Sequence, residues 1–376
     1  MSYQVIPVND SRTMDDFIRL PFSIYKNDPH WVAPVTQEVR RTLNPSLNPY
    51  FKNADLKLFL CRKEKEPVSR VAVIINRNHF KKFGVKAAFF GFFESLEDTQ
   101  AAHHLFSAAE NYCIGQGAEL LEGPFNPHHY SELGLQTSGH GTPPTFFQTY
   151  NPPYYQKFLE HSGFSVAERL HTRKNETIRD YLHNRYKNLK ASRVNGDYRI
   201  RPFNMRDIPN ELERIREVNN DAFSDNWHFL PLSLDEYTFS AKYLRLVTKP
   251  ELIQIVEHKG KPVAVLHYVL DVNPALKKMK GRPGPLKYGR FLYEKKKIRK
   301  LVIFSVAVKK AYQRGRAFYL ILNAACRIAK KYDSLETTWM SEKNIPAVQT
   351  AQLLGLKEDK YFFIYKKHFS TIKKGK

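Results

Sequence analysis

The residues best suited to do chemistry lie at a basic turn within VAVKKAYQRGRAFYLIL, at positions 306–322. A β-branched run ends there, and an apolar helical pattern begins after Gly315. The first turn of a helix has unpaired backbone N–H groups and a partial positive charge, which suits it to hold phosphate. Cations at a helix start are mildly unfavourable unless an anion binds there. The pattern therefore predicts an anion site, and the alternative is a basic surface turn.

Three carboxylates stand where they could take up a proton. Glu336 shares one face of a predicted strand, 335–339, with Thr338. In a partly dry cleft a carboxylate has a raised pKa and can accept a proton from an ammonium group. Asp271 and Glu342 are the other two, although Asp271 also suits a turn after the predicted hairpin at 251–271. We predict Glu336 as the first choice for a general base, and a hydrogen-bonded structural role is the alternative.

The cysteines and histidines do not indicate a metal centre or a disulfide framework. Cys61, Cys113 and Cys326 are far apart and odd in number, and the pairs His103-His104 and His128-His129 lack ligand spacing. No apolar run is long enough to cross a bilayer, and the start MSYQVIPVND does not resemble a secretory signal. We therefore expect a cytoplasmic protein with no metal.

The net charge of the 376-residue chain is +23, with 60 Lys and Arg against 37 Asp and Glu. Such a surplus favours an acidic partner, which leaves nucleic acid, anionic lipid, an acyl carrier protein and a phosphate-bearing cofactor open. The charge is clustered at Lys277–Lys280, Lys295–Lys300, Lys309-Lys310 and the tail. Solvated loops are the alternative explanation for these clusters.

The elements that must position these residues occur in the same order in both halves of the chain. Hydrophobic periodicity predicts strand, helix, hairpin, strand, helix, strand and helix, first within 3–163 and again within 199–365. A polar, basic segment with a predicted helix at 177–191 joins the halves. We expect an α/β (α+β) fold with a first domain at 1–170, a basic helical linker at 171–198 and a second domain at 199–376.

The second half resembles the GNAT acyltransferase superfamily, in which a strand leads into a glycine-containing loop that opens a helix and holds the pyrophosphate of coenzyme A. Gly315 and Ala317 match the glycine positions of that loop, and Asn344 opens a segment similar to the family's N-x-x-A helix. The stretches FFGFFE (89–94), EGPFNP (122–127) and YNPPYY (150–155) are similar to uncharacterised bacterial double-GNAT proteins. The resemblance implies two tandem GNAT-like units, each a mixed, mostly antiparallel sheet flanked by helices. The first unit resembles a degenerate copy that shapes the substrate cleft.

The resemblance implies an N-acyltransferase that uses acetyl-CoA or a longer acyl-CoA and an amine-bearing small molecule. The catalytic groups would be Glu336 and the strand around Ser305, whose backbone N–H groups would stabilise the oxyanion. The implied coenzyme A contacts are Val306, Val308, Gln313, Arg314, Gly315, Arg316, Ala317 and Asn344. The implied acceptor contacts are Asn226, Trp227, Asp271 and Trp339.

Two positions depart from the family pattern. Tyr312 stands where the loop has Gln or Arg, and Ala351 stands where many members have a tyrosine that acts as general acid. Two rival functions therefore stay open. One is a transferase that uses aminoacyl-tRNA or an acyl carrier protein, and the other is a catalytically inactive module that binds nucleic acid or an anionic membrane.

Overall fold

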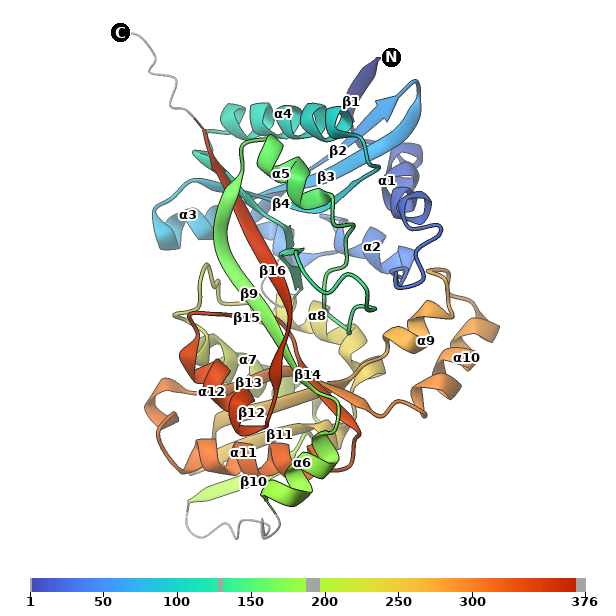
Figure 1. Cartoon of the computed structure of the whole chain (residues 1–376). Helices are drawn as coiled ribbons and strands as arrows, with labels where there is room; N and C mark the ends of the chain where they lie inside the picture. Colours follow the sequence, from blue (N-terminus) through green and yellow to red (C-terminus); the bar gives the residue numbers. More distant parts are fainter. Residues whose placement is uncertain (1, 128–130, 187–196, 370–376) are drawn as a thin grey trace. The chain divides into compact units, whose positions relative to one another are not determined.

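The structure is a computed structural model that describes residues 2–127, 131–186 and 197–369. The chain forms two compact units (Figure 1). Unit 1 contains the chain up to Leu170, the segment Leu276–Tyr288 and the chain from Lys360 onward. Unit 2 contains His171–Ala275 and Gly289–Asp359. Each unit therefore takes chain from both halves of the sequence.

Unit 1 is built on a sheet with the strand order β1-β2-β3-β4-β5-β16. All neighbouring strands are antiparallel except β4 and β5, which are parallel. The elements are β1 (Tyr3–Pro7), α1 (Ser11–Ile24), α2 (Thr36–Thr42), β2 (Ala54–Lys63), β3 (Glu66–Asn76), α3 (Arg77–Phe83), β4 (Ala87–Ser95), α4 (Thr99–Gly115), β5 (Leu120–Gly123), β6 (Phe125–Asn126), β7 (Glu132–Leu133), β8 (Leu135–Gln136) and α5 (Tyr155–His161).

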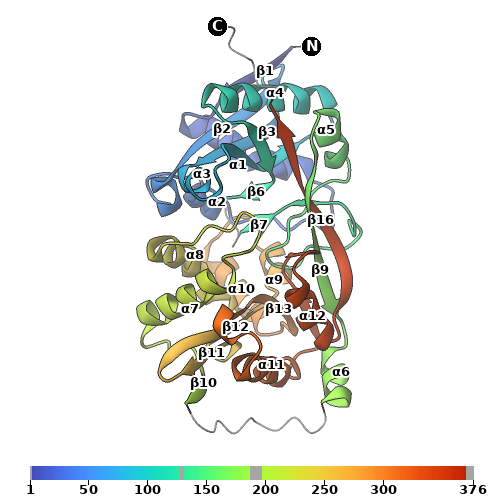
Figure 2. The same cartoon turned by 90° about the vertical axis from the view of Figure 1, so that its left-hand side faces the viewer.

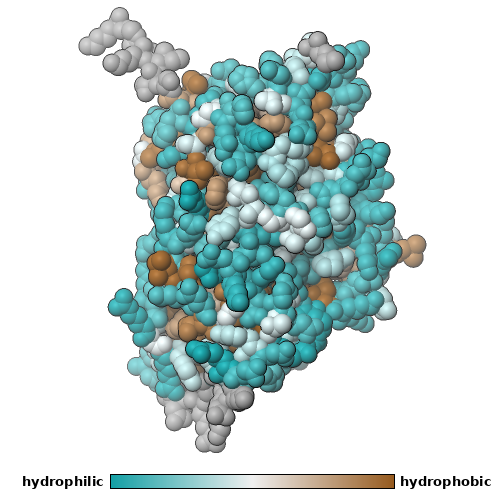
Figure 3. Space-filling view, viewed as in Figure 1, coloured by the Kyte–Doolittle hydropathy of each residue, from teal (hydrophilic) through white to brown (hydrophobic). Residues whose placement is uncertain are grey.

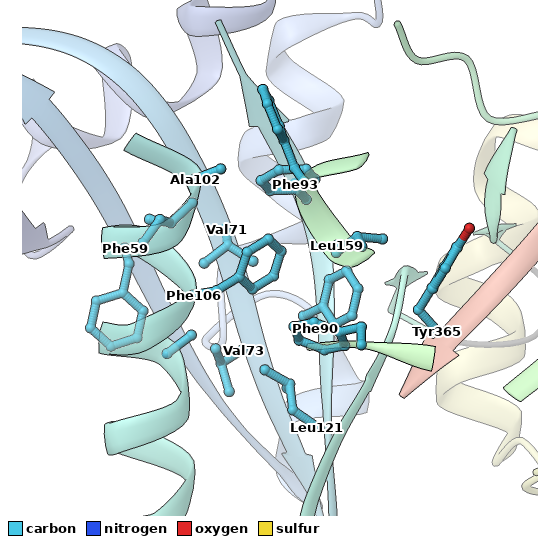
Figure 4. Close-up of a cluster of buried hydrophobic side chains, with 14 of the residues drawn as sticks. Phe59, Val71, Val73, Phe90, Phe93, Ala102, Phe106, Leu121, Leu159 and Tyr365 are labelled. Carbon is cyan, nitrogen blue, oxygen red and sulfur yellow. The ribbon is translucent and has the colours of Figure 1, made fainter. Parts of the chain in front are cut away.

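The larger core of unit 1 lies between its sheet and α4 with α5. Phe106 of α4 packs edge-on against Phe90 of β4, and both are fully buried (Figure 4). A smaller cluster, with Phe17 of α1 and Leu58 of β2, adds further buried side chains. Because the sheet is covered by α4 and α5, β4 is buried along most of its length.

Unit 2 repeats this plan with the strand order β14-β13-β12-β11-β10, in which only β13 and β14 are parallel. The elements are α6 (Ile178–Arg185), β10 (Tyr198–Pro202), α7 (Ile208–Ala222), α8 (Leu234–Val247), β11 (Ile253–His258), β12 (Lys261–Leu270), β13 (Lys300–Val308), α11 (Arg316–Ala329), β14 (Ser334–Thr337), β15 (Met340–Ser341) and α12 (Ile345–Leu353). Two more helices, α9 (Asn273–Lys277) and α10 (Pro285–Lys295), include residues of both units.

Helices α7 and α11 cover opposite faces of the unit 2 sheet. The Tyr268 hydroxyl approaches the carbonyl oxygen of Ala325 in α11 at 3.5 Å. The next strand residue, His267, is the register partner of Ser305, whose hydroxyl donates to Asn219 of α7 at 3.2 Å. Because consecutive strand residues point to opposite faces, these contacts place α7 and α11 on different sides.

Two long strands, β9 (Ser165–Asn175) and β16 (Lys357–His368), each contribute to both units. They neighbour each other and run side by side in Figures 1 and 2. The end of β16 pairs with β5 in unit 1, and the end of β9 pairs with β14 in unit 2. Each half of the sequence therefore completes its sheet with a strand that the other half supplies.

Most expected elements occur close to their expected positions, but β9 was not expected. Its residues fall in the segment that we interpreted as the end of the first domain and a polar linker. Several polar side chains of β9 are buried, among them Thr172 and Arg173. Arg173 is matched by an ion pair with Glu358, and its N–H donates to Thr337 at 2.9 Å. The expected linker helix is present as α6, and residues 187–191 of that expectation lie outside the described residues.

Candidate functional site

The centre of the candidate site is the point in unit 2 where β13 and β14 part. They pair from Lys300 with Ser334 to Ile303 with Thr337, and the Thr338 N–H then donates to the Ile303 oxygen at 3.2 Å. β14 ends at Thr337, whereas β13 continues to Val308 paired only with β12. Residues 304–308 therefore form a strand edge that β14 no longer covers.

The backbone of this edge presents N–H groups away from β12. The Lys309 N–H donates to the Val263 oxygen of β12 at 2.9 Å, and alternation then directs the amides of Val306 and Val308 to the opposite side. The Gln313 side chain reaches the Val308 oxygen on that side at 3.4 Å. Amides fixed in this way can stabilise a carbonyl oxygen that becomes negative.

A basic loop follows β13 directly. It makes one short helical turn at Lys310–Tyr312 and enters α11 at Gly315, the N-cap residue, which offers no side-chain cap. In this fully described segment, the N–H of Gly315 is bonded to the Tyr312 oxygen at 3.3 Å. The N–H groups of the segment that find no acceptor among the described residues belong to Arg314, Arg316, Ala317 and Phe318.

Gly315 begins the helix and has no side chain that could accept from the free N–H groups of the first turn. Its φ of −131° suits any residue, and a Cβ there would meet only the Tyr312 oxygen, at 3.6 Å. Arg314 is exposed and forms no ion pair with any described residue, whereas Arg316 lies 5.7 Å from the Tyr198 ring centre. The helix start therefore combines free amides with two arginines, which is what an anion such as pyrophosphate requires.

The other polar groups of the loop are tied to the protein. Lys310 pairs with Asp225 at 2.6 Å and its N–H donates to Asp221 at 2.8 Å, while Lys309 pairs with Glu217. These contacts join the basic loop to the end of α7 and to the segment that follows it. That segment holds Asn226 and Trp227, two of the predicted acceptor contacts.

Ser305 belongs to a buried polar group on the α7 side of the sheet. Its hydroxyl donates to Asn219, whose amide lies 3.5 Å from the Tyr237 hydroxyl of α8. A register shift leaves Phe304 as the extra residue of β13 opposite His267. This irregularity re-aims the strand at the place where β14 ends.

His267 is a site residue that the sequence reasoning missed. It is 3% exposed, and neither ring nitrogen has a hydrogen-bond partner in the described chain. Burial lowers the pKa of His267 to about 3, so the ring is neutral at physiological pH. No sequence motif predicts His267 as a site residue, because only the pairing of β12 with β13 brings it opposite Ser305.

Glu336 and Asp271 come together through a shared lysine. The Lys300 ammonium lies 2.6 Å from Glu336 and 3.9 Å from Asp271, and both carboxylates are almost fully buried. Burial opposes the charge of Lys300, but the two carboxylates raise its pKa overall. The three residues therefore form a buried ion cluster where β13 and β14 pair, and the role of Glu336 as general base stays a prediction.

The remaining predicted residues have local roles. Asn344 caps α12 and accepts from the Ala347 N–H at 3.2 Å. Trp339 is half-buried in the connection between β14 and β15, and Ala351 is buried in α12. Asn226 shapes its loop, since its backbone oxygen accepts from the Phe229 N–H at 3.0 Å.

The corresponding gap in unit 1 is filled by its own chain. β4 and β5 pair from Ala87 to Phe89 and then part, but β6 lies against β4 beyond that point. The Asn126 side chain accepts from the Phe92 N–H at 2.7 Å, and a Cβ at Gly91 would be 1.9 Å from the Phe125 oxygen. Helix α4 is capped by Asp98, which repels an anion.

Comparison with known proteins shows that this architecture recurs. No protein-family model matches the chain. A tandem GNAT protein from the clavulanic acid biosynthesis pathway superposes over 98% of both chains with a TM-score of 0.56 at 12% identity. The chain has a tandem GNAT fold. The resemblance to GNAT proteins implied tandem units of mixed, mostly antiparallel sheet flanked by helices, and this fold is confirmed, with the strands of both units joined in one large mixed sheet through β9 and β16.

Two curated proteins are similar in sequence to this chain along nearly its whole length. A protein of Caulobacter vibrioides named bacterial ceramide synthase is 28% identical over 372 residues, covering 96% of this chain and 97% of its own. Protein YghO of Escherichia coli is 26% identical over 363 residues, covering 93% and 92%. Within the described residues, none of the helices is long and apolar enough to cross a membrane.

Proposed function

We propose that the chain is an N-acyltransferase that moves an acyl group from acyl-coenzyme A to an amine. The observation that carries this proposal is the β13 edge at 304–308, which β14 does not pair, beside the uncapped start of α11. The fold supports N-acyl transfer in general, and these residues suit a donor that carries a pyrophosphate. Unit 2 would be the catalytic unit, because the equivalent gap of unit 1 is filled.

In this proposal the free amides of the α11 start, with Gln313, Arg314 and Arg316, hold the pyrophosphate. The pantetheine arm would lie along the uncovered edge of β13, and the Val306 and Val308 amides would bond it and the thioester oxygen. The amine nitrogen attacks the carbonyl carbon, the C–S bond breaks and coenzyme A leaves. The nitrogen gives up one proton and the departing thiolate takes one up.

Ser305 and His267 are the polar side chains that we place nearest to this chemistry. The neutral imidazole can accept a hydrogen bond from the amine and orient its lone pair. The Ser305 hydroxyl, which donates to Asn219 in the structure, would have to turn away from Asn219 to donate to the departing sulfur. Glu336 then acts through its ion pair with Lys300, which holds β13 and β14 together below the gap. This differs from the expected role of Glu336 as general base.

We propose a long-chain amino alcohol as the acceptor and a long-chain acyl group as the donor. The specific support is the similarity to the protein named bacterial ceramide synthase across 96% of this chain. A ceramide is the amide of a fatty acid with such an amino alcohol. Polar amines and acetyl-CoA are the alternative pair, given the wide use of this fold.

The test is an assay of amide product by mass spectrometry with palmitoyl-CoA or acetyl-CoA and either sphinganine or a polar diamine. We expect product with palmitoyl-CoA and sphinganine. Gly315→Glu places a carboxylate at the anion site, and we expect product to fall about a hundredfold or more, because the added negative charge repels the pyrophosphate and competes for the same N–H groups. Gly115→Glu is the matched control, since that exposed glycine of α4 also has open space around its Cβ.

Product formation that is equal in Gly315→Glu and the wild type would remove the basic loop from the proposal. Transfer that requires aminoacyl-tRNA or an acyl carrier protein in place of coenzyme A would favour the rival donor. An absence of product with every donor, together with tight binding of RNA or anionic vesicles, would favour an inactive binding module.

A further inference from the structure

Helix α10 carries its large apolar side chains toward solvent. Leu286 is 91% exposed and Tyr293 is 61% exposed, although both are large apolar or aromatic residues. Leu292 is 39% exposed, and Phe291 is the buried residue of the helix. Figure 3 shows hydrophobic surface at the right-hand edge, where α10 lies in Figure 1.

Leu286 and Tyr293 share one face of the helix, whereas Tyr288, which is 44% exposed, lies on the other side. At 100° per residue, Leu286, Gly289 and Tyr293 follow the i, i+3, i+7 spacing of a single stripe, and Leu292 lies at its margin. Phe291 and the partly buried Lys287 and Lys295 lie on the opposite side. The helix therefore buries one apolar side chain, Phe291, and exposes an apolar stripe to solvent on the opposite side. We call this stripe the α10 outer face.

The α10 outer face is set in a strongly basic stretch. From Lys277 to Arg299 the chain has ten Lys and Arg and one acidic residue, Glu294, so 10 − 1 gives a net charge of +9. Lys297 pairs with Glu294 at 3.5 Å and also lies 4.0 Å from the Tyr293 ring centre. The exposed cations of the stretch are Lys277, Lys278, Lys280, Arg282, Arg290, Lys296, Lys297 and Arg299.

We propose that the α10 outer face docks on an anionic lipid bilayer, with Leu286 and Tyr293 entering the headgroup region. A short helix with an apolar stripe and flanking cations binds such a surface through apolar burial and attraction to anionic lipid. Nucleic acid would use the cations but would gain nothing from two exposed leucines. A second copy of the chain would place a net charge of +9 against another +9. This proposal goes beyond acyl transfer and does not depend on it.

The test is sedimentation of the full chain with vesicles of phosphatidylcholine alone or with phosphatidylglycerol added. We expect binding only to the anionic vesicles, and weaker binding as salt rises. The double variant Leu286→Glu with Tyr293→Glu should bind about tenfold or more weakly, because both apolar contacts are lost and two negative charges face the lipid. Leu47→Glu, at a leucine that is 58% exposed in unit 1, should bind like the wild type.

A second pair of variants separates local charge from net charge. Arg290→Glu with Lys296→Glu should reduce vesicle binding strongly, whereas Lys81→Glu with Lys157→Glu changes the net charge equally at exposed sites of unit 1. Equal losses in the two pairs would overturn the proposal, as would unchanged binding in the Leu286 and Tyr293 variant. The proposal also fails if the variant Leu286→Glu with Tyr293→Glu keeps its vesicle binding but loses RNA binding. It fails likewise if this variant keeps its vesicle binding but loses self-association, as measured by light scattering.

The melting temperature and the coenzyme A binding of each variant show whether it is folded. Side chains as exposed as Leu286 contribute little to the core, so we expect both properties to match the wild type. Failure of coenzyme A binding in all proteins would count against acyl transfer and leave membrane docking standing. Loss of vesicle binding with coenzyme A binding retained would show the two sites to be separate.

Discussion

Units 1 and 2 have the same sheet order and the same parting of two parallel strands, but among the described residues only unit 1 places another strand, β6, against the edge beyond the parting. In unit 1 the gap is occupied by β6, and the next helix begins at an aspartate that caps it. In unit 2 the β13 edge beyond Ile303 has no β14 partner, and the next helix begins at an uncapped glycine between two arginines. The same strand arrangement is therefore covered by protein in unit 1 and lies beside a basic, uncapped helix start in unit 2, and a few residues determine the difference.

The comparison teaches that the strand gap alone is not a binding site. The same geometry becomes part of the core when a chain segment and a capping carboxylate fill it. It becomes a site for an anionic donor when amides stay free and cations stand beside them. The two helix starts show this contrast most clearly, because Asp98 caps α4 with a carboxylate whereas Gly315 leaves α11 without a side-chain cap.

The largest expected effect concerns the two glycines that lie beside these gaps. A Cβ at Gly91 would be 1.9 Å from the Phe125 oxygen, so Gly91→Ala must displace backbone. We expect the free energy of unfolding to fall by about 3 kcal/mol, the upper part of the range for overpacking. In Gly315→Ala the new Cβ has space, and we expect a change within about 0.5 kcal/mol. Urea denaturation measures both, and equal stability of the two variants would contradict the filled gap of unit 1.

An intermediate effect should appear in the pH dependence of unit 2. His267 has a pKa of about 3 in the folded chain, below the ordinary value near 6.5, because burial disfavours its charged form. The unfolded chain therefore binds a proton that the folded chain excludes, and stability falls as pH drops below about 6.5 and continues to fall toward pH 3.

The matched variant for this effect is His267→Leu, which cannot titrate. Between pH 6.5 and pH 5 the wild type should lose roughly 1–2 kcal/mol more of its free energy of unfolding than the variant. Parallel pH profiles would show that His267 is solvated in the folded chain. The same variant should bind coenzyme A normally and form less product, because His267 lies away from the proposed pyrophosphate contacts.

The smallest expected effect concerns the cap of α4 in unit 1. The Asp98 side chain accepts from the Ala101 N–H at 3.1 Å and pairs with Lys63 at 2.8 Å. Asp98→Ala should lower the free energy of unfolding by about 1 kcal/mol, the usual cost of losing a cap. It should leave coenzyme A binding unchanged, because β6 still fills the gap. A second equivalent of bound coenzyme A in this variant would show that the cap alone prevents unit 1 from binding coenzyme A.

The sequence was sufficient to predict the duplicated order of elements and the basic loop, because both depend on local patterns. Periodicity identified the strand before Gly315 and the helix after it, and helix physics explains why that loop should attract an anion. The strand β9 could not be predicted in this way. Its buried Arg173, for example, donates to Thr337 and to the Leu356 oxygen, both more than 150 residues away in sequence.

The same limit applies to the side chains of the site. Glu336 was predicted as a base from strand alternation, but alternation cannot show that Lys300 lies 2.6 Å from it. His267 was missed because only the pairing of β12 with β13 brings it opposite Ser305. The exposed stripe of α10 was hidden for a related reason, since the sequence showed its cations but not which of its apolar residues face solvent.

Calorimetric titration of coenzyme A into the full chain tests the central claim most directly. If the free amides of the α11 start form the anion site and unit 1 is closed by its own β6, the wild type binds one equivalent and Gly315→Glu binds none. A stoichiometry of two per chain, or unchanged binding by Gly315→Glu, would contradict this account.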